Sequence, residues 1–285
     1  MAGSVDDRAP ASPSPARAPF SPEDSPITRA SLVADLRALG VAPGATLLVH
    51  AALSRVGWVF GGTQAVIGAL LEALGPEGTL MMPTHSTDLT EPSRWQAPPV
   101  PESWQQAIRD GLPPYDAART PTRQMGALAE TFRRWPGVRR SGHPYGSFAA
   151  LGPRTDALLD GHAPGCAFGE ASPLGALYRA HGQVLLLGVG HGNDTSLHLA
   201  EYRAHWPSKA EHEEGSPMVV DGERRWVTYR ELRHDDEDFE TLGAAWEARA
   251  GEALRVGPVG RAEARLIDQR ALVDFATAWM NEHRR

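Results

Sequence analysis

Residues 45–82 read ATLLVHAALSRVGWVFGGTQAVIGALLEALGPEGTLMM, and this stretch indicates the class of fold. The short apolar run at 45–50 is typical of a buried strand, and 78–82 repeats the pattern. Between them, 64–74 carries apolar residues at helical spacing and ends at Gly75. Two strands joined through a helix predict an α/β domain in which these strands are parallel.

The same alternation continues outside this stretch. Further helices are predicted at 31–39, 174–180, 195–203, 235–250 and 269–282, where apolar residues recur at helical spacing. Further strands are predicted at 183–189 and 262–267, and Asp221-Gly222 between two alternating runs predicts a β-hairpin. We therefore expect a single elaborated α/β domain with a mixed, largely parallel sheet, flanking helices and a C-terminal hairpin and helix subregion.

Two segments do not follow this alternation. Residues 1–26 are rich in Pro, Ala and Ser and lack the apolar core of a secretory signal, so we expect a disordered tail before a domain at 27–285. Residues 84–120 contain many prolines together with Trp95, Trp104 and Tyr115. A long irregular excursion of this kind is typical of a binding loop or a lid, which predicts a substrate-side insertion.

The composition limits the classes of function. Of the 285 residues, 28 are basic and 35 are acidic, and the net charge of −7 works against non-specific binding of nucleic acid. The single cysteine, Cys166, excludes an internal disulfide and a cysteine-based zinc site. No apolar run approaches the roughly 20 residues that a bilayer span needs. We expect a cytoplasmic protein without a metal, a membrane or a nucleic acid as partner.

Polar residues follow three of the predicted strands, at 49–52, 83–86 and 188–196. Ligands collect beyond the carboxyl ends of parallel strands, so these segments are candidates for a site. The last segment is rich in glycine and runs into a helix, so its amides could meet a phosphate or an oxyanion. Its spacing does not match a dinucleotide fingerprint, and a tight strand-to-helix turn is the alternative.

His198 is the candidate catalytic base. An imidazole has an ordinary pKa of about 6.5 and is suited to remove a proton from an amine. Such a base needs a carboxylate on its other ring nitrogen, and Glu201, Asp235, Asp236 and Asp238 are the candidates. A structural role for this histidine is the alternative. His198, His205 and His212 recur every seven residues, but Pro207 interrupts the run and argues against a metal site.

Several segments resemble the aminoglycoside 3-N-acetyltransferases. They are VHAALS at 49–54, RTPTRQMGAL at 119–128, RSGHP at 140–144, SFAALG at 147–152 and NDTSLHLAE at 193–201. The likeness extends from about residue 28 to the C-terminus, and the last segment is its most specific part. The branch with a long Trp- and Pro-rich insertion is particularly similar.

The resemblance implies transfer of an acetyl group from acetyl-CoA to the 3-amine of a 2-deoxystreptamine aminoglycoside, an activity linked to antibiotic resistance. It also implies a family-specific fold, distinct from that of the general N-acetyltransferase superfamily. His198 matches the family's catalytic histidine, and Asp235 matches an acidic partner in the substrate pocket. Glu201 belongs to the same motif, and Asp88 and Glu170 fall where the family places acids that face the substrate.

Coenzyme A would need amide donors and basic side chains for its phosphates. The residues expected to bind it are His50, Ala51, Ala52, Leu53, Ser54, Arg55, Thr84, Arg123, Met125 and Gly126. Ala51-Ala52 stand where the family usually has Ser-Ser, so a hydroxyl contact to the cofactor is lost. No activated Cys or Ser is evident, so direct attack of the amine is expected without an acetyl-enzyme.

Two other functions stay open. One is an N-acyltransferase that modifies another amine in natural-product metabolism through the same site. The other is a catalytically silent relative that binds coenzyme A or an amine. The sequence leaves open the preferred amine, the choice between monomer and homodimer, and whether the insertion closes as a lid.

Overall fold

The computed structural model describes residues 25–285. The predicted tail lies almost wholly in residues 1–24, outside the described residues. Where the description begins, Ile27 forms a parallel bridge with Val59, and its carbonyl accepts a hydrogen bond from the amide of Phe60. The start of the described chain is therefore tied to the segment that follows the first strand.

Within residues 25–285, seven strands form one sheet in the order β3-β4-β2-β1-β5-β9-β8. The strands are β1 (Thr46–Ala51), β2 (Thr79–Pro83), β3 (Arg139–Arg140), β4 (Phe148–Leu151), β5 (Gln183–Leu187), β8 (Leu254–Val259) and β9 (Ala262–Asp268). The central strand β1 is parallel to β2 and β5, and the outer pairings are antiparallel. Only β4 and β9 therefore run against the other five strands of this sheet, which confirms the mixed, largely parallel sheet.

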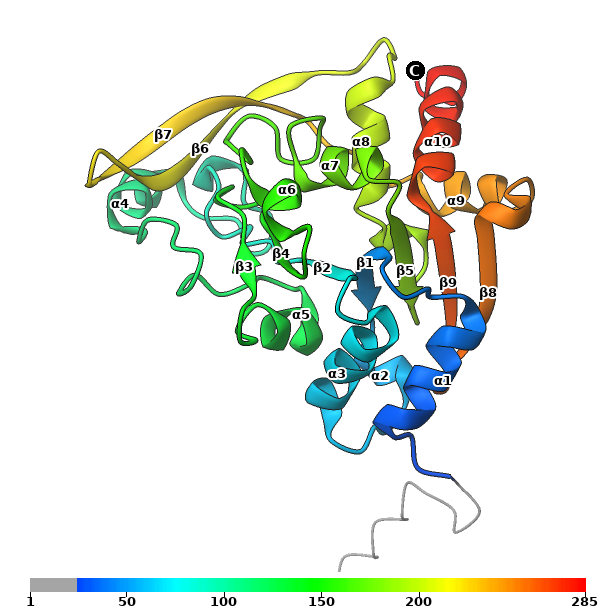
Figure 1. The fold of residues 1–285 in the computed structure, drawn as a ribbon. Helices are drawn as coiled ribbons and strands as arrows, with labels where there is room; N and C mark the ends of the chain where they lie inside the picture. The colour runs from blue at the N-terminus through cyan, green and yellow to red at the C-terminus, as the bar shows by residue number, and fades with distance from the viewer. Residues whose placement is uncertain (1–24) are drawn as a thin grey trace, which may run out of the picture.

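Helices cover both faces of the sheet (Figure 1). One layer contains α1 (Arg29–Leu39), α2 (Leu53–Val56), α3 (Gly62–Leu74) and α5 (Gly126–Phe132). The other contains α6 (Thr155–Leu159), α7 (Pro173–Arg179), α8 (Ser196–Arg203), α9 (Phe239–Glu247) and α10 (Gln269–His283). The 3₁₀ turns are η1 (Pro92–Arg94), η2 (His191–Asn193) and η3 (Gly251–Ala253). The predicted helix at 235–250 is wrong at its start, because α9 begins at Phe239.

The alternation of side chains along β1 divides the core into two parts. Leu47 and Val49 pack into the core under α1 and α3, whereas Leu48 packs into the core that includes α8 and α10. Because side chains alternate between the two faces of a strand, His50 lies on the same face as Leu48. The last residues of β1 therefore present this imidazole toward the layer that contains α8.

The predicted hairpin is confirmed and consists of β6 (Glu211–Val220) and β7 (Glu223–Leu232). Asp221 and Gly222 have φ values of 53° and 81°, as a two-residue turn between twisted strands requires. The hairpin extends away from the sheet toward α4 (Glu102–Gly111), as Figure 1 shows. The amide of Tyr115 donates to the carbonyl of Pro217 at 2.9 Å, so the hairpin and the 84–120 insertion are joined.

Candidate active site

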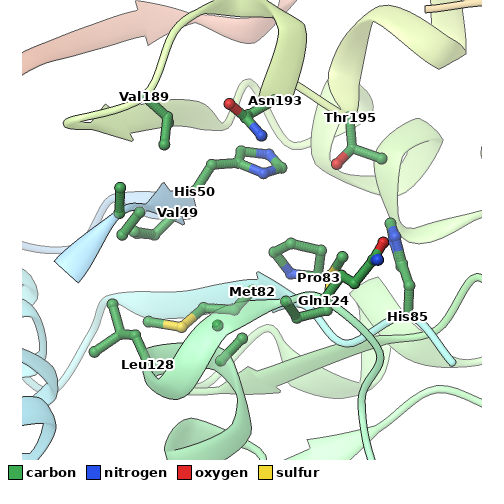
Figure 2. A pocket seen from close by; sticks show the side chains of 15 residues that line it. Val49, His50, Met82, Pro83, His85, Gln124, Leu128, Val189, Asn193 and Thr195 are labelled. Atoms are coloured by element: carbon green, nitrogen blue, oxygen red, sulfur yellow. The ribbon is translucent and has the colours of Figure 1, made fainter. Parts of the chain in front are cut away.

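A cavity of about 350 Å³ lies beyond the carboxyl ends of β1, β2 and β5. The chain leaves β1 for β2 on one side and later returns as β5 on the other, so this is the point where the strand order reverses. The lining residues are Val49, His50, Ala51, Ala52, Met82, Pro83, His85, Gln124, Met125, Gly126, Leu128, Ala129, Val189, Asn193 and Thr195. Figure 2 shows His50, Asn193 and Thr195 on one side of it, and Met82, Gln124 and His85 on the other.

His198 lies on α8, three residues before Glu201, so both side chains emerge on the same face of the helix. His198 Nδ1 is 2.6 Å from Glu201 Oε2. The imidazole side chain is 15% exposed, whereas the carboxylate has no exposed surface. A hydrogen bond from Nδ1 to a carboxylate leaves Nε2 as the ring nitrogen that can accept a proton.

Aromatic rings fix the plane of the His198 imidazole. Phe168 stacks on it with ring centres 4.9 Å apart and an angle of 19° between the planes. Phe239 and His234 lie at 4.9 Å and 5.0 Å, respectively. These contacts and the bond to Glu201 together restrict the rotation of the ring.

Two histidines that line the cavity, His50 and His85, lie within electrostatic reach of His198. Burial, with a further contribution from nearby His198, lowers the pKa of His50 to about 3, and the same causes lower the pKa of His85. Both rings are therefore neutral at physiological pH. Their Nε2 atoms are buried and have no hydrogen-bond partner among residues 25–285. Unpartnered buried nitrogens at a cavity are suited to meet polar groups of a ligand.

The other carboxylate oxygen of Glu201, Oε1, also has hydrogen-bond partners. It accepts hydrogen bonds from the amide of Asp235 at 2.9 Å and from Arg284 Nη1 at 2.6 Å. Burial raises the pKa of Glu201, but the hydrogen bonds from His198 and Arg284 outweigh it, so the pKa lies below its ordinary value. Glu201 is thus an anion with both oxygens hydrogen-bonded, Oε2 to His198 and Oε1 to Arg284 and the amide of Asp235.

The glycine-rich turn after β5 is held by α9. The amide of Gly192 donates to Glu240 Oε1 at 2.8 Å, so it is occupied by a carboxylate and is not open to a phosphate. A Cβ on Gly190 would lie 2.4 Å from that same oxygen, so a larger residue there would require the flexible end of the Glu240 side chain to move. The expectation that this turn offers its amides to an anion is therefore wrong at Gly192. Asn193 and Thr195 contribute side chains to the cavity instead.

Half of the predicted cofactor residues line this cavity: His50, Ala51, Ala52, Met125 and Gly126. The amide of Ala52 donates to the carbonyl of Leu187, so it is already engaged. Thr84 is fully buried and its hydroxyl donates to the carbonyl of Ser147, because alternation along the chain turns it away while Pro83 and His85 face the cavity.

The remaining predicted cofactor residues lie outside the lining of this cavity. Leu53, Ser54 and Arg55 follow β1 on α2. The Arg123 guanidinium is 3.5 Å from Asp88 Oδ1 and donates to the carbonyl of Ala97 at 3.2 Å. It therefore ties the insertion to the segment before α5.

The three predicted substrate acids lie in different surroundings. Asp88 is exposed and lines two further cavities of about 370 and 480 Å³. The insertion forms most of both, with Arg123 and Gln124 added in the smaller cavity and Pro121 and the hairpin residue Val219 in the larger. Glu170 pairs with Arg203 at 2.6 Å and Arg179 at 3.7 Å and does not line the cavities that Asp88 lines. The exposed Asp235 carboxylate accepts a hydrogen bond from the amide of Glu237. Asp235 is hydrogen-bonded to Glu201 through its backbone amide and not through its side chain.

A second buried network supports the ring stack. Glu231 accepts from the amide of Ala167 at 3.1 Å and from the hydroxyl of Tyr202, which is also 3.2 Å from His234 Nε2. Burial lowers the pKa of His234 to about 3, so this ring is neutral beside His198. Glu231 thus fixes the residue before Phe168 and the tyrosine that holds His234.

Sequence reasoning missed Phe168, His234 and Arg284. The aromatic ring and the histidine lie in irregular segments with no periodic pattern, and the arginine is 83 positions from Glu201.

Burial raises the pKa of the Cys166 thiol, so this cysteine is not activated as a nucleophile. Across residues 25–285, no group of three or more potential ligands could hold a metal ion, and no helix is long and apolar enough to cross a membrane.

The chain is similar to proteins of known family. Residues 48–281 match the family model described as aminoglycoside 3-N-acetyltransferase. The SPbeta prophage-derived aminoglycoside N(3')-acetyltransferase-like protein YokD of Bacillus subtilis is 44% identical over 89% of this chain and 92% of its own length. Aminoglycoside N(3)-acetyltransferase VII of Streptomyces paromomycinus is 39% identical over 91% of this chain and 93% of its own.

Solved structures share the fold. The crystal structure of YokD has a TM-score of 0.88, covering 92% of this chain and 97% of its own. AAC-IIIb in a binary complex with CoASH has a TM-score of 0.80 at 32% identity, covering 90% of this chain and 97% of its own. AAC-VIa bound to sisomicin also has a TM-score of 0.80, at 31% identity, covering 90% and 98% of the two chains.

Proposed function

The chain belongs to the aminoglycoside 3-N-acetyltransferase family, and from that premise we propose that it acetylates the 3-amino group of a 2-deoxystreptamine aminoglycoside, with acetyl-CoA as the donor. Acetyl-CoA is the co-substrate of this class of enzyme, and a neighbour with the same fold binds CoASH. The observation that carries the proposal is the His198–Glu201 pair, in which His198 lies within electrostatic reach of His50 and His85, two residues that line the cavity at the strand ends.

His198 acts as the general base in this proposal. The amine nitrogen attacks the thioester carbonyl carbon, and the proton that it loses goes to His198 Nε2. Glu201 accepts the hydrogen bond from Nδ1 and stabilises the imidazolium that forms. The carbon–nitrogen bond has then formed and the carbon–sulfur bond breaks. Coenzyme A leaves as a thiolate that takes the proton from the imidazolium, which gives the free thiol and regenerates neutral His198. Direct transfer suits a site in which the pKa of the only cysteine, Cys166, is raised.

The cavity at the strand ends is the proposed place for the reactive arm of the donor. Its residues Ala51, Ala52, Met82 and Leu128 give it apolar walls suited to a narrow, uncharged chain. His50 Nε2 and His85 Nε2 supply unpartnered polar atoms for the amide or thioester groups of that chain. Because burial keeps both rings neutral, they contribute no positive charge that would repel a cationic acceptor.

Exposed carboxylates are the proposed recognition elements for the acceptor. Asp88 lies where the insertion and the hairpin meet, and Asp235, Asp236 and Glu237 form an exposed acidic run beside the His198–Glu201 pair. A polycation is concentrated by such a surface, which also orients one of its amines. Glu170 is a weaker candidate, since two arginines already neutralise it.

The test is product analysis with a panel of aminoglycosides. The protein is incubated with acetyl-CoA and each compound, thiol release is followed, and the acetylated nitrogen is located by NMR. Acetylation at the 3-amine, absent for an analogue that lacks this amine, is the expected result. Acetylation only of other amines would replace the proposal by a general N-acyltransferase. Binding of acetyl-CoA without thiol release would replace it by a silent binding protein.

A further inference from the structure

The geometry points to Arg284 and Asp238 as a pair of positioning residues that set the proton affinity of the His198–Glu201 pair. This inference rests on the proposed function for its kinetic test but not for its spectroscopic one. Arg284 follows the end of α10, three residues beyond the segment that matches the family model. It is 86 positions from His198, so packing of the fold alone brings the two together.

Arg284 is held at every nitrogen of its guanidinium. Nη1 donates to Glu201 Oε1 at 2.6 Å, Nε and Nη2 donate to the two oxygens of Asp238 at 2.8 and 2.6 Å, and Nη2 also donates to the carbonyl of Asp235 at 2.7 Å. Its side chain is only 7% exposed, and the guanidinium carbon lies 4.9 Å from the ring centre of Trp206. A side chain with this many partners is fixed and desolvated, so its charge acts at close range.

The two carboxylates around Arg284 face different directions. Glu201 joins the arginine to His198, whereas Asp238 lies on the far side of the guanidinium and, in the structure of residues 25–285, makes no hydrogen bond with the imidazole. Arg284 therefore opposes an additional proton on the His198–Glu201 pair, whichever of the two residues would carry it. Asp238 weakens that effect, because it balances part of the positive charge.

Other charged or titratable groups near the pair are present in every variant. They are His50, His85, Asp194, His234 and Lys209, with the exposed Asp235 at the boundary. Burial holds His50, His85 and His234 neutral across the pH range of an enzyme assay. Within residues 25–285, none of their side chains is hydrogen-bonded to Arg284 or Asp238, so a difference between variants reports first on these two residues.

Because Arg284 and Asp238 carry opposite charges, removing one or the other should move the acid limb of the pH profile in opposite directions. Arg284→Met removes the cation, so the pair holds its proton more strongly and the acid limb of the pH profile of kcat/KM moves upward by about one pH unit. Asp238→Asn removes an anion and leaves the cation, so the acid limb moves downward by a smaller amount. Arg284→Lys keeps the charge and restores the acid limb while losing part of kcat. Arg285→Met, which removes the neighbouring charge, leaves the limb unchanged.

A titration that needs no turnover accompanies the kinetics. The imidazole NMR signal of His198, identified by its loss in His198→Gln, is followed against pH in each variant. Opposite shifts of its midpoint in Arg284→Met and Asp238→Asn support the inference even if no acceptor is turned over. Shifts of the same sign, or unmoved midpoints in folded variants, overturn it. If Arg284→Met does not fold, the near-isosteric Asp238→Asn still decides, because a midpoint that fails to move downward contradicts the inference.

Discussion

His198 Nδ1 and Glu201 Oε2 lie 2.6 Å apart on one face of α8, and the carboxylate is completely buried. This relationship assigns the two nitrogens of the imidazole different tasks, because only Nε2 remains free to accept a proton. It also makes Glu201 the partner of His198 among the four acids that the sequence offered.

Glu201→Gln should lower kcat by about 10²-fold. The amide has no negative charge to stabilise the imidazolium, and it can turn its NH₂ group toward His198 and disturb the tautomer. The KM for acetyl-CoA should change little, because Glu201 does not line the cavity at the strand ends. Steady-state kinetics by thiol release measure both constants. Glu282→Gln, at an exposed position on α10, is the matched control, and an unchanged kcat in Glu201→Gln would rule out the proposed role.

Asp235→Asn should raise the KM for a polycationic acceptor about two- to fivefold and leave the KM for acetyl-CoA nearly constant. The exposed side chain acts at the surface, while the backbone amide that holds Glu201 is retained. The difference should shrink at high ionic strength. Glu77→Gln serves as control, because this exposed residue precedes β2 at the amino ends of the parallel strands, away from the cavity. Equal effects on the two KM values would speak against an acceptor-binding role.

Ala52→Ser should lower the KM for acetyl-CoA about three- to tenfold, since a new hydroxyl in the cavity can form a hydrogen bond with the donor. The backbone amide of Ala52 already donates to Leu187, so the alanine itself offers the donor no hydrogen bond from its amide. Titration of acetyl-CoA at saturating acceptor measures the effect. A lower KM for the acceptor instead would place the donor elsewhere.

The free energy of unfolding should fall steeply below about pH 6.5. Burial lowers the pKa of His50, His162 and His234 to about 3 in the folded protein, so the unfolded chain takes up protons first as the pH drops. The contribution of these histidines to stability is therefore fully present above the pKa that they have in the unfolded chain, and it is lost between about pH 6.5 and 3. Each such histidine contributes up to about 1.4 kcal/mol per pH unit.

Denaturant unfolding at pH 7.5, 6.0 and 5.0 measures this slope. His162→Gln should flatten it by about the share of one proton, whereas substitution of the exposed His181 should not. A free energy of unfolding that stays constant from pH 7.5 to 5.0 would show that these histidines are not held neutral by the fold.

The sequence was sufficient to predict the strands and helices that bury a regular apolar pattern. β1, β2, β5 and the hairpin turn at Asp221-Gly222 were predicted because local pattern and tertiary environment agree there. By contrast, α4 buries no residue and lies within the proline-rich insertion, and β8 contains Gly257-Pro258, which are unusual inside a strand. Residues with weak local signals depend on their neighbours for their conformation.

The site was predictable to the extent that it is local in sequence. His198 and Glu201 are one helical turn apart, so their contact follows from helix geometry once the segment is known to be helical. Thr84 was misplaced because the residue that faces the cavity depends on the alternation at the end of β2. The contact between Arg284 and Glu201 depends on how α10 packs against α8, which no short-range pattern in the sequence encodes.

The most direct measurement is single-turnover acetyl transfer by His198→Gln, compared with the unchanged protein at saturating acetyl-CoA and aminoglycoside. Glutamine retains a polar side chain of similar length but cannot accept the proton of the amine. We expect a loss of about 10²- to 10⁴-fold in the rate of transfer, with binding of acetyl-CoA preserved. A His198→Gln protein that transfers the acetyl group at the original rate would contradict the assignment of His198 as the base.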